Sequence, residues 1–240
     1  MLAGMPSRIE DYALIGDCQT AALVGRDGSI DWLCFPRFDS GACFAALLGA
    51  SEHGRWLIAP KGVIQNVSRR YRGDTLVLET TFETDDGVVT MTDCMPIRTD
   101  EPDLVRLVRG ISGRVRMHTE LIVRFDYGSI TPWVRRESRG LRAVGGPDTI
   151  EVCTPVPLRG DGWTTVGEFD VAAGEEVPFV LHWHQSHVEP PTPIDAAAAV
   201  EATVEWWEGW ASRCTYTGEY REAVMRTDRR HRCRSDDVAA

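Results

Sequence analysis

Short runs in which apolar and polar residues alternate dominate the chain between residues 55 and 183. Turn residues separate these runs at short intervals, as Asp85-Asp86-Gly87 does between two of them. In a strand, such alternation turns one set of side chains toward a core and the other set outward. Many short strands divided by turns predict a mainly β fold, an antiparallel β-sandwich rather than a parallel sheet. The expected strands cover residues 56–60, 64–72, 75–84, 88–96, 104–112, 115–125, 149–155, 165–171 and 176–183.

A tight hairpin is predicted near the N-terminus. Two apolar runs, residues 20–24 and 29–35, flank the turn sequence of residues 25–28, whose Asp-Gly pair can adopt the positive φ angles that a hairpin needs. The second run is expected to alternate strictly, with one face formed by Ile30, Trp32 and Cys34 and the other by Asp31, Leu33 and Phe35. Proline at position 36 ends the strand, so charged and aromatic side chains collect on the loop that follows.

The composition changes after Trp183. Three prolines in residues 189–194 predict a stiff, extended linker. Asp195 can then cap an amphipathic helix that runs to about Ser212, and residues 195–225 also contain the expected start of a second helix near Gly218. One face of the first helix is lined by Val200, Val204, Trp207 and Ala211. This short α-helical segment needs a partner surface, either the sandwich or a following helical domain.

Composition and charge exclude several classes of protein. Hydrophobic residues at 43% and charged residues at 26% are ordinary values for a globular chain. A net charge of −10 argues against general affinity for nucleic acid or an anionic membrane surface. Residues 1–10 lack the apolar stretch of a secretory leader, and no apolar run approaches the ~20 residues that a membrane-spanning helix needs. We therefore expect a cytoplasmic protein with neither nucleic acid nor membrane as a partner.

Residues 9–48 and several later motifs carry a family resemblance. The residues in register are Gly16, Asp17, Thr20, Ala21, Gly28, Asp31, Trp32, Pro36, Phe38 and Asp39. Further motifs are GRW at 54–56, DCMP at 93–96 and the Trp- and Tyr-rich pattern at 206–224. Up to about residue 224 the chain resembles the bacterial glycoside hydrolase family 15 proteins, the trehalase and glucoamylase-like group. That family has an N-terminal β-sandwich domain, of a supersandwich-like type, followed by an (α/α)6 barrel that carries the catalytic carboxylates.

The resemblance implies a division of the chain and an absence of catalytic residues. Residues 1–188 correspond to the sandwich domain and 189–194 to a linker, while 195–225 correspond to the linker helix and the start of the first barrel helix. Both catalytic glutamates of the family belong to barrel loops beyond residue 240, so none is assigned here and the isolated chain is expected to be non-catalytic.

The resemblance also implies substrates and a partner. In the parent protein the expected substrate is an α-glucoside, α,α-trehalose, with malto-oligosaccharide and a glucoamylase-like activity as the alternative. The expected docking partner is the helical (α/α)6 domain, and hydrolysis of this kind requires no cofactor. Two other functions stay open from the sequence: a free carbohydrate-binding module, and a scaffold that docks a separately encoded helical domain.

Residues 226–240 depart from the family pattern. They are crowded with arginine and leave no apolar face. We interpret them as the product of a changed reading frame or of truncation, with a solvated tail as the alternative.

Candidate substrate-proximal residues lie at the end of the N-terminal hairpin. These are Trp32, Arg37, Phe38 and Asp39. An aromatic face can stack on a sugar ring while carboxylates accept its hydroxyl protons, so this stretch is expected to reach over the substrate entrance of the parent enzyme. The favoured interpretation is nevertheless a structural hairpin, in which the carboxylates of Asp17, Asp31 and Asp39 cap turns, pair with Arg26 or Arg37, or accept hydrogen bonds from loop amides.

Two further groups of residues have a functional and a simpler interpretation. His182 and His184 face the same way on a strand and His187 follows a short bend, so the three could form a zinc site, although solvated histidines and no metal are the favoured interpretation. A sugar-binding platform would need exposed aromatic rings, whereas Trp133, Trp163 and Trp183 are expected on strands as core or sheet-face residues.

Overall fold

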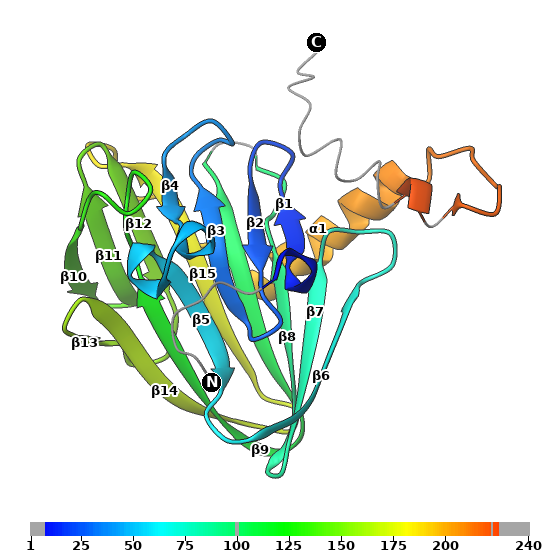
Figure 1. The fold of residues 1–240 in the computed structure, drawn as a ribbon, viewed down its shortest axis with the longest axis horizontal. Helices are drawn as coiled ribbons and strands as arrows, with labels where there is room; N and C mark the ends of the chain where they lie inside the picture. The colour runs from blue at the N-terminus through cyan, green and yellow to red at the C-terminus, as the bar shows by residue number, and fades with distance from the viewer. Residues whose placement is uncertain (1–7, 99–100, 222, 226–240) are drawn as a thin grey trace.

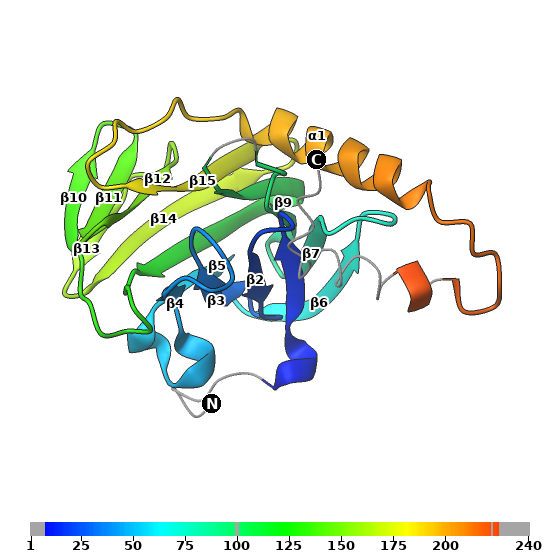
Figure 2. The ribbon, with the colours of Figure 1, turned by 90° about the horizontal axis from the view of Figure 1, so that it is seen from above.

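The computed structural model describes residues 8–98, 101–221 and 223–225, so the expected tail at 226–240 lies outside the described residues. Two antiparallel β-sheets face each other, and one helix lies across the outer side of one of them (Figure 1, Figure 2). The predicted mainly β fold with a short helical segment after the sandwich is therefore confirmed. Within the described residues, no helix is both long enough and apolar enough to span a membrane.

The strands fall into two sheets that share the long strand β9 (Asp103–Ile122). Sheet 1 contains one half of β9 with β1 (Ala13–Gly16), β2 (Ala21–Val24), β3 (Ser29–Cys34), β4 (Ala42–Phe44), β5 (Arg55–Pro60), β13 (Arg159–Asp161) and β14 (Thr164–Ala172). Sheet 2 contains the other half with β6 (Ile64–Tyr71), β7 (Leu78–Thr84), β8 (Gly87–Cys94), β10 (Trp133–Glu137), β11 (Gly140–Gly145), β12 (Asp148–Cys153) and β15 (Glu176–Gln185).

The apolar core fills the space between the sheets. Its fully buried side chains include Phe44, Trp56, Ile58, Phe82 and Phe179. These residues come from both sheets, as alternating strands in a sandwich require. Because the core is continuous across the molecule, residues 8–185 form one unit.

β9 corrects one feature of the expected strand pattern. The sequence predicts two strands, at 104–112 and 115–125, whereas the structure has one strand of 20 residues. Gly113 adopts a φ of 67° within it, and the pairing register of β8 shifts between Val88 and Val89 opposite this point. A bulge bends a strand without ending it, so β9 can continue from sheet 2 into sheet 1. Gly110, Ser112 and Gly113 are residue types that favour turns, so the sequence predicts a break in the strand where the structure has a bulge.

Strands β10 and β11 were missing from the expected pattern. They form an antiparallel hairpin in which Trp133 lies opposite Val144 and Glu137 opposite Gly140. β10 has four exposed residues in succession because it is the edge strand of sheet 2. In this strand the apolar Trp133 and Val134 are as exposed as the two arginines that follow, so the alternation on which sequence-based prediction depends is absent.

The N-terminal hairpin is confirmed, but its strict alternation is wrong. β2 and β3 pair antiparallel around a turn in which Gly28 adopts a φ of 85°. Leu23 pairs with Trp32 and Val24 with Ile30, which leaves Asp31 as an extra residue in β3. This bulge changes the phase of the strand, and both Ile30 and Leu33 therefore enter the core between the sheets.

Helix α1 (Ala196–Ala211) follows the linker as predicted. The Asp195 side chain caps it by accepting a hydrogen bond from the Ala198 backbone N–H at 3.0 Å. Its predicted apolar face is buried, with Val200 and Val204 packed against Val105 of β9 and Val180 of β15. The sandwich itself is thus the partner surface for this half of the helix, as Figure 2 shows from above.

A second helical stretch follows α1. Residues 221 and 223–225 are helical, and the Val224 backbone N–H donates to the Tyr220 carbonyl at 2.9 Å. The turn before them begins at Gly218, whose carbonyl accepts from the Arg221 N–H at 3.1 Å. A helix starting near Gly218 is therefore present in the described residues.

Candidate functional site

Three candidate residues, Arg37, Phe38 and Asp39, lie on a loop at residues 35–41 that we call the β3–β4 loop, and Trp32 lies near the end of β3 itself. The Phe38 backbone N–H donates to the Gln19 carbonyl at 3.1 Å, so this loop contacts the connection between β1 and β2. Both connections project from the same end of sheet 1 (Figure 1). The geometry brings two segments of the sequence resemblance together at one end of the sandwich.

Trp32 stands half-buried at this end. It packs against a small buried cluster of Cys34, Ala42 and Ala45, and its ring centroid is 6.0 Å from that of Tyr127. Tyr127 has 48% of its surface exposed and adopts a left-handed φ of 56°. The partner ring comes from a distant loop, and nothing in the sequence near Trp32 indicates it. Together the two residues present a partly exposed aromatic surface.

Arg37 and Asp39 form an exposed ion pair beside Phe38. The Arg37 Nε lies 3.0 Å from the Asp39 Oδ1, and this hydrogen bond lowers the pKa of the Asp39 carboxyl. Asp39 is therefore ionised near neutral pH and can accept a hydrogen bond but not donate a proton. Phe38 between them is 41% exposed. The loop thus offers a charged pair and an aromatic ring to the solvent.

Asp17 has a different and fully buried role. Its Oδ1 accepts hydrogen bonds from the backbone N–H groups of Gln19 and Thr20 at 2.9 and 2.7 Å. Its Oδ2 accepts from the Arg98 Nε at 2.6 Å, and both side chains are nearly inaccessible, at 0% and 5% exposure. This carboxylate closes the turn between β1 and β2, and Arg98 is a partner that the sequence analysis missed.

Asp31, the bulge residue of β3, is also held by its neighbours. The Tyr12 hydroxyl donates to its Oδ2 at 2.6 Å, and the Ser29 hydroxyl donates to its Oδ1. Asp17, Asp31 and Asp39 therefore have separate partners. The Arg26 guanidinium instead donates to the Val67 carbonyl at 3.1 Å.

His182 and His184 face the same way, with ring centroids 6.0 Å apart, but each has its own acidic neighbour. The His182 Nδ1 is 2.5 Å from an Asp103 carboxylate oxygen, while the His184 Nε2 is 3.5 Å from Glu151. His187 is exposed on the turn after β15. Among the residues that the structure describes, no group of three or more His, Cys, Asp or Glu side chains could hold a metal ion.

The three tryptophans considered as a sugar platform, Trp133, Trp163 and Trp183, lie in different environments. Trp183 is 5% exposed and its Nε1 donates to the Asp148 carboxylate at 3.0 Å, so it is a core residue as expected. Trp163 is 77% exposed on the turn between β13 and β14, and Trp133 is 81% exposed on the edge strand β10. The expected strand position is wrong for Trp163, because Gly162 before it adopts a turn conformation with a φ of 59°.

The sequence analysis also missed a buried ion pair in the core. The Arg106 Nε donates to the Asp93 carboxylate at 2.8 Å, and both side chains have 0% exposure. The other guanidinium nitrogens donate to the backbone carbonyls of Trp56 and Gly28 at 2.8 and 2.6 Å. This pair joins the hairpin turn of β2–β3 to β5, β8 and β9. The pair therefore fixes the turn end of the β2–β3 hairpin, and the other end of β3 leads into the candidate site.

Two facing antiparallel sheets, with a helix across the outer side of one of them, define the class of this protein as a β-sandwich domain. Residues 1–183 match the family described as "Trehalase-like, N-terminal", and the chain therefore belongs to this family. The resemblance stated from the sequence is confirmed.

Curated relatives extend the match along the chain. A trehalase of Thermoplasma volcanium is 26% identical over 226 residues, which cover 92% of this chain and 36% of the relative. A trehalase of Mycobacterium tuberculosis is 31% identical over 229 residues, covering 84% of this chain and 33% of the relative. The chain thus spans about a third of the length of the curated relatives it matches.

A solved structure has the same fold. The crystal structure of a bacterial glucoamylase complexed with acarbose superposes with a TM-score of 0.60 over 88% of this chain and 38% of that chain. Its sequence identity of 9% makes this a likeness of fold alone.

Proposed function

We propose that this chain serves as the non-catalytic N-terminal domain of a protein that hydrolyses α-glucosides, with α,α-trehalose as the first candidate substrate and malto-oligosaccharide as the second. The observation that carries the proposal is the family match over residues 1–183, together with trehalase as the name of the curated relatives. The sandwich would dock a helical catalytic domain, and its loops would border the substrate entrance.

The environments of the carboxylates support a non-catalytic role. Inverting hydrolysis of a glycosidic bond uses a protonated carboxyl and a second carboxylate some ~6.5–9.5 Å away, with a water molecule between that second group and the sugar. Asp39 is unsuited to act as the general acid, because its hydrogen bond with Arg37 lowers its pKa and leaves it ionised near neutral pH. Asp17 is paired with Arg98 and inaccessible to a substrate. Neither residue combines a retained proton with access.

The C-terminal end of α1 supports a docking role. Trp206 and Trp210 are half-buried and flank the buried Trp207, with ring centroids 5.0 and 5.8 Å from it. Tyr220, in the following segment, is 66% exposed. We propose that residues 1–188 form the sandwich domain, 189–194 the linker, and 195–225 the elements that lead into the helical domain.

The cysteines favour a reducing compartment. The structure describes six of them, and all six are free thiols. Burial raises the pKa of the Cys94 thiol to about 12, which suppresses the reactive thiolate. Free, unreactive cysteines are usual in the cytoplasm, which we propose as the location.

The proposal predicts that the purified chain does not turn over α-glucosides. With trehalose or maltose as substrate, glucose release should stay at the level of a buffer control, because the acid and base of the reaction are not supplied by this domain. A coupled glucose assay at several concentrations of the purified chain measures the rate of glucose release. Release that scales with protein concentration through many turnovers would contradict the proposal.

Calorimetric titration of the same sample with trehalose separates two other functions, a free carbohydrate-binding module and a scaffold. Saturable binding without hydrolysis would favour a free carbohydrate-binding module. Absence of sugar binding, with association to a separately expressed helical domain, would favour a scaffold.

Trp32 should contribute to substrate binding in a longer protein that carries this domain ahead of a helical catalytic domain. We expect Trp32→Ala to raise KM roughly threefold to tenfold, since one stacked aromatic face is lost, and to change kcat less. Steady-state kinetics measures the split. Trp133→Ala, which removes an exposed ring on β10, an edge strand of sheet 2, is the matched control. Equal KM values for the two variants would refute a place for Trp32 at the substrate entrance.

A further inference from the structure

One edge of the sandwich contains a cleft between the two sheets. β10 is the edge strand of sheet 2 and β13 the edge strand of sheet 1, and residues from both line a cavity of about 320 Å³. Leu141 and Leu158, which are 3% and 9% exposed and belong to the core, line its inner side. The space is of the size that a small molecule occupies.

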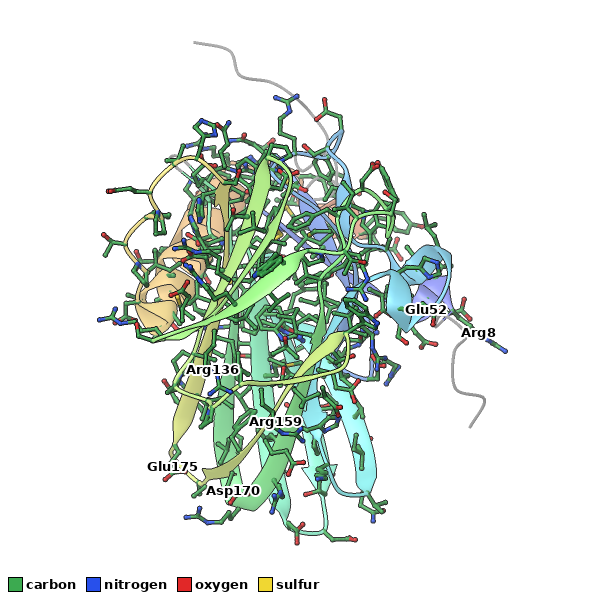
Figure 3. The ribbon with its side chains drawn as sticks, turned by 90° about the vertical axis from the view of Figure 1, so that its left-hand side faces the viewer. Arg8, Glu52, Arg136, Arg159, Asp170 and Glu175 are labelled. Atoms are coloured by element: carbon green, nitrogen blue, oxygen red, sulfur yellow. The ribbon has the colours of Figure 1, made fainter. Side chains whose placement is uncertain are left out.

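Three arginines line this cleft: Arg124, Arg136 of β10 and Arg159 of β13. Figure 3 shows Arg136 and Arg159 on the same side of the molecule. No described residue pairs any of the three with a carboxylate, and no described residue that lines the cleft is acidic. Elsewhere arginines are commonly paired, as Arg135 next in the chain is with Glu137 at 2.7 Å. Arg124 donates to the Val123 carbonyl at 2.7 Å, and Arg136 and Arg159 are exposed to solvent. In a chain with a net charge of −10, three arginines without an acidic neighbour give this cleft a local positive charge that attracts anions.

The remaining groups around the cleft suit a hydroxylated ring. Thr131, Thr164 and Thr165 line it, and their hydroxyls can both donate and accept. The exposed Trp163 also lines the cleft and offers a flat face for a ring to stack on. A Cβ built on Gly160 or Gly162 would meet no atom within 4 Å, so a ligand can approach the backbone of this hairpin closely.

We infer that this cleft binds a small hydroxylated ring molecule that carries a phosphate or carboxylate group, as a sugar phosphate or a sugar acid does. The guanidinium groups of Arg136 and Arg159 bind the anionic group, because planar guanidinium matches both oxyanions with paired hydrogen bonds. Burial also lowers the pKa of Arg124, and a bound anion offsets that loss of hydration. Trp163 stacks on the ring. The inference does not rest on the proposed function, because it uses none of the residues at the β3–β4 loop.

Isothermal titration calorimetry of the full chain at low salt tests this with four probes: glucose 6-phosphate, glucuronate, glucose and inorganic phosphate. We expect saturable binding of at least one of the two charged sugars at millimolar concentrations, and weaker binding of both glucose and inorganic phosphate. The better of the two charged sugars identifies the anionic group. Equal binding of glucose and the charged sugars, binding of inorganic phosphate as tight as that of the charged sugars, or no saturable binding would overturn the inference.

Matched variants locate the site. Arg159→Ala should weaken binding of the charged sugar roughly tenfold, whereas Arg114→Ala, an exposed arginine on β9 outside the cleft, should not. Trp163→Ala should weaken it as well, and Trp133→Ala, an equally exposed tryptophan outside the cleft, should leave it unchanged. All four positions are exposed, so the variants should fold normally, and circular dichroism verifies this. Unchanged affinity in Arg159→Ala would refute the assignment of the anion to this cleft.

Discussion

Asp93→Asn should lower the free energy of unfolding by about 3–5 kcal/mol, because it leaves the Arg106 charge uncompensated inside the core. Both side chains of the pair are fully buried, and burial raises the pKa of Asp93 while Arg106 opposes that rise. The change alters shape little, so the loss would come from charge. Urea unfolding followed by tryptophan fluorescence measures it.

Two further variants test the cause of this loss. Asp170→Asn, on the exposed surface of β14, should stay within about 0.5 kcal/mol of the parent chain. Replacing both partners, as Asp93→Leu with Arg106→Met, should recover part of the stability. Recovery stays incomplete because the Gly28 and Trp56 carbonyls lose the Arg106 donors. A loss in Asp93→Asn no larger than in Asp170→Asn would show that a charged Asp93 carboxylate does not stabilise the fold.

Trp207→Ala should cost about 3–5 kcal/mol and loosen the C-terminal half of α1. Trp207 has no exposed surface and packs against Leu76, so its removal leaves a cavity between the helix and the sandwich. The same urea experiment measures the stability. Limited proteolysis at the 189–194 linker reports whether the helix detaches, and we expect faster cleavage in the variant.

Trp207→Phe separates packing from hydrogen bonding. The Trp207 Nε1 is buried without a hydrogen-bond partner among the described residues, so its removal relieves an unsatisfied donor while most of the aromatic contact remains. We expect a clearly smaller loss than for Trp207→Ala. Trp163→Ala, at an exposed position, serves as the control for tryptophan removal. If Trp207→Ala lost no more stability than this control, the helix would not depend on Trp207.

Features with local signals were predictable from the sequence. The hairpin around Gly28 and the helix capped by Asp195 both follow from residues adjacent in the chain, and both are present. The strands with apolar alternation were predicted for the same reason. β10 was not, because an exposed edge strand buries too little apolar surface to leave a period of two. β11 does alternate, but it is short and begins and ends in glycine, which favours a turn in a sequence-based prediction.

Features that depend on distant partners were not predictable. Arg106 resembles any polar position in an alternating strand, and only the fold brings Asp93 and two backbone carbonyls around it. At the candidate site, the sequence placed Trp32 near a strand end but gave no indication of Tyr127. The basic cleft likewise combines residues from two sheets that meet only in three dimensions.

Strand β9 has a consequence for how the domain is made on the ribosome. Its neighbours are β5 and β8, which precede it, and β14 and β15, which follow it. A nascent chain that has emerged only as far as residue 160 would present one unpaired edge along most of β9. Such an edge is a template for association with other chains. β9 is paired along both edges only after residue 185 has emerged from the ribosome. A chaperone would protect the nascent chain most in the interval before that.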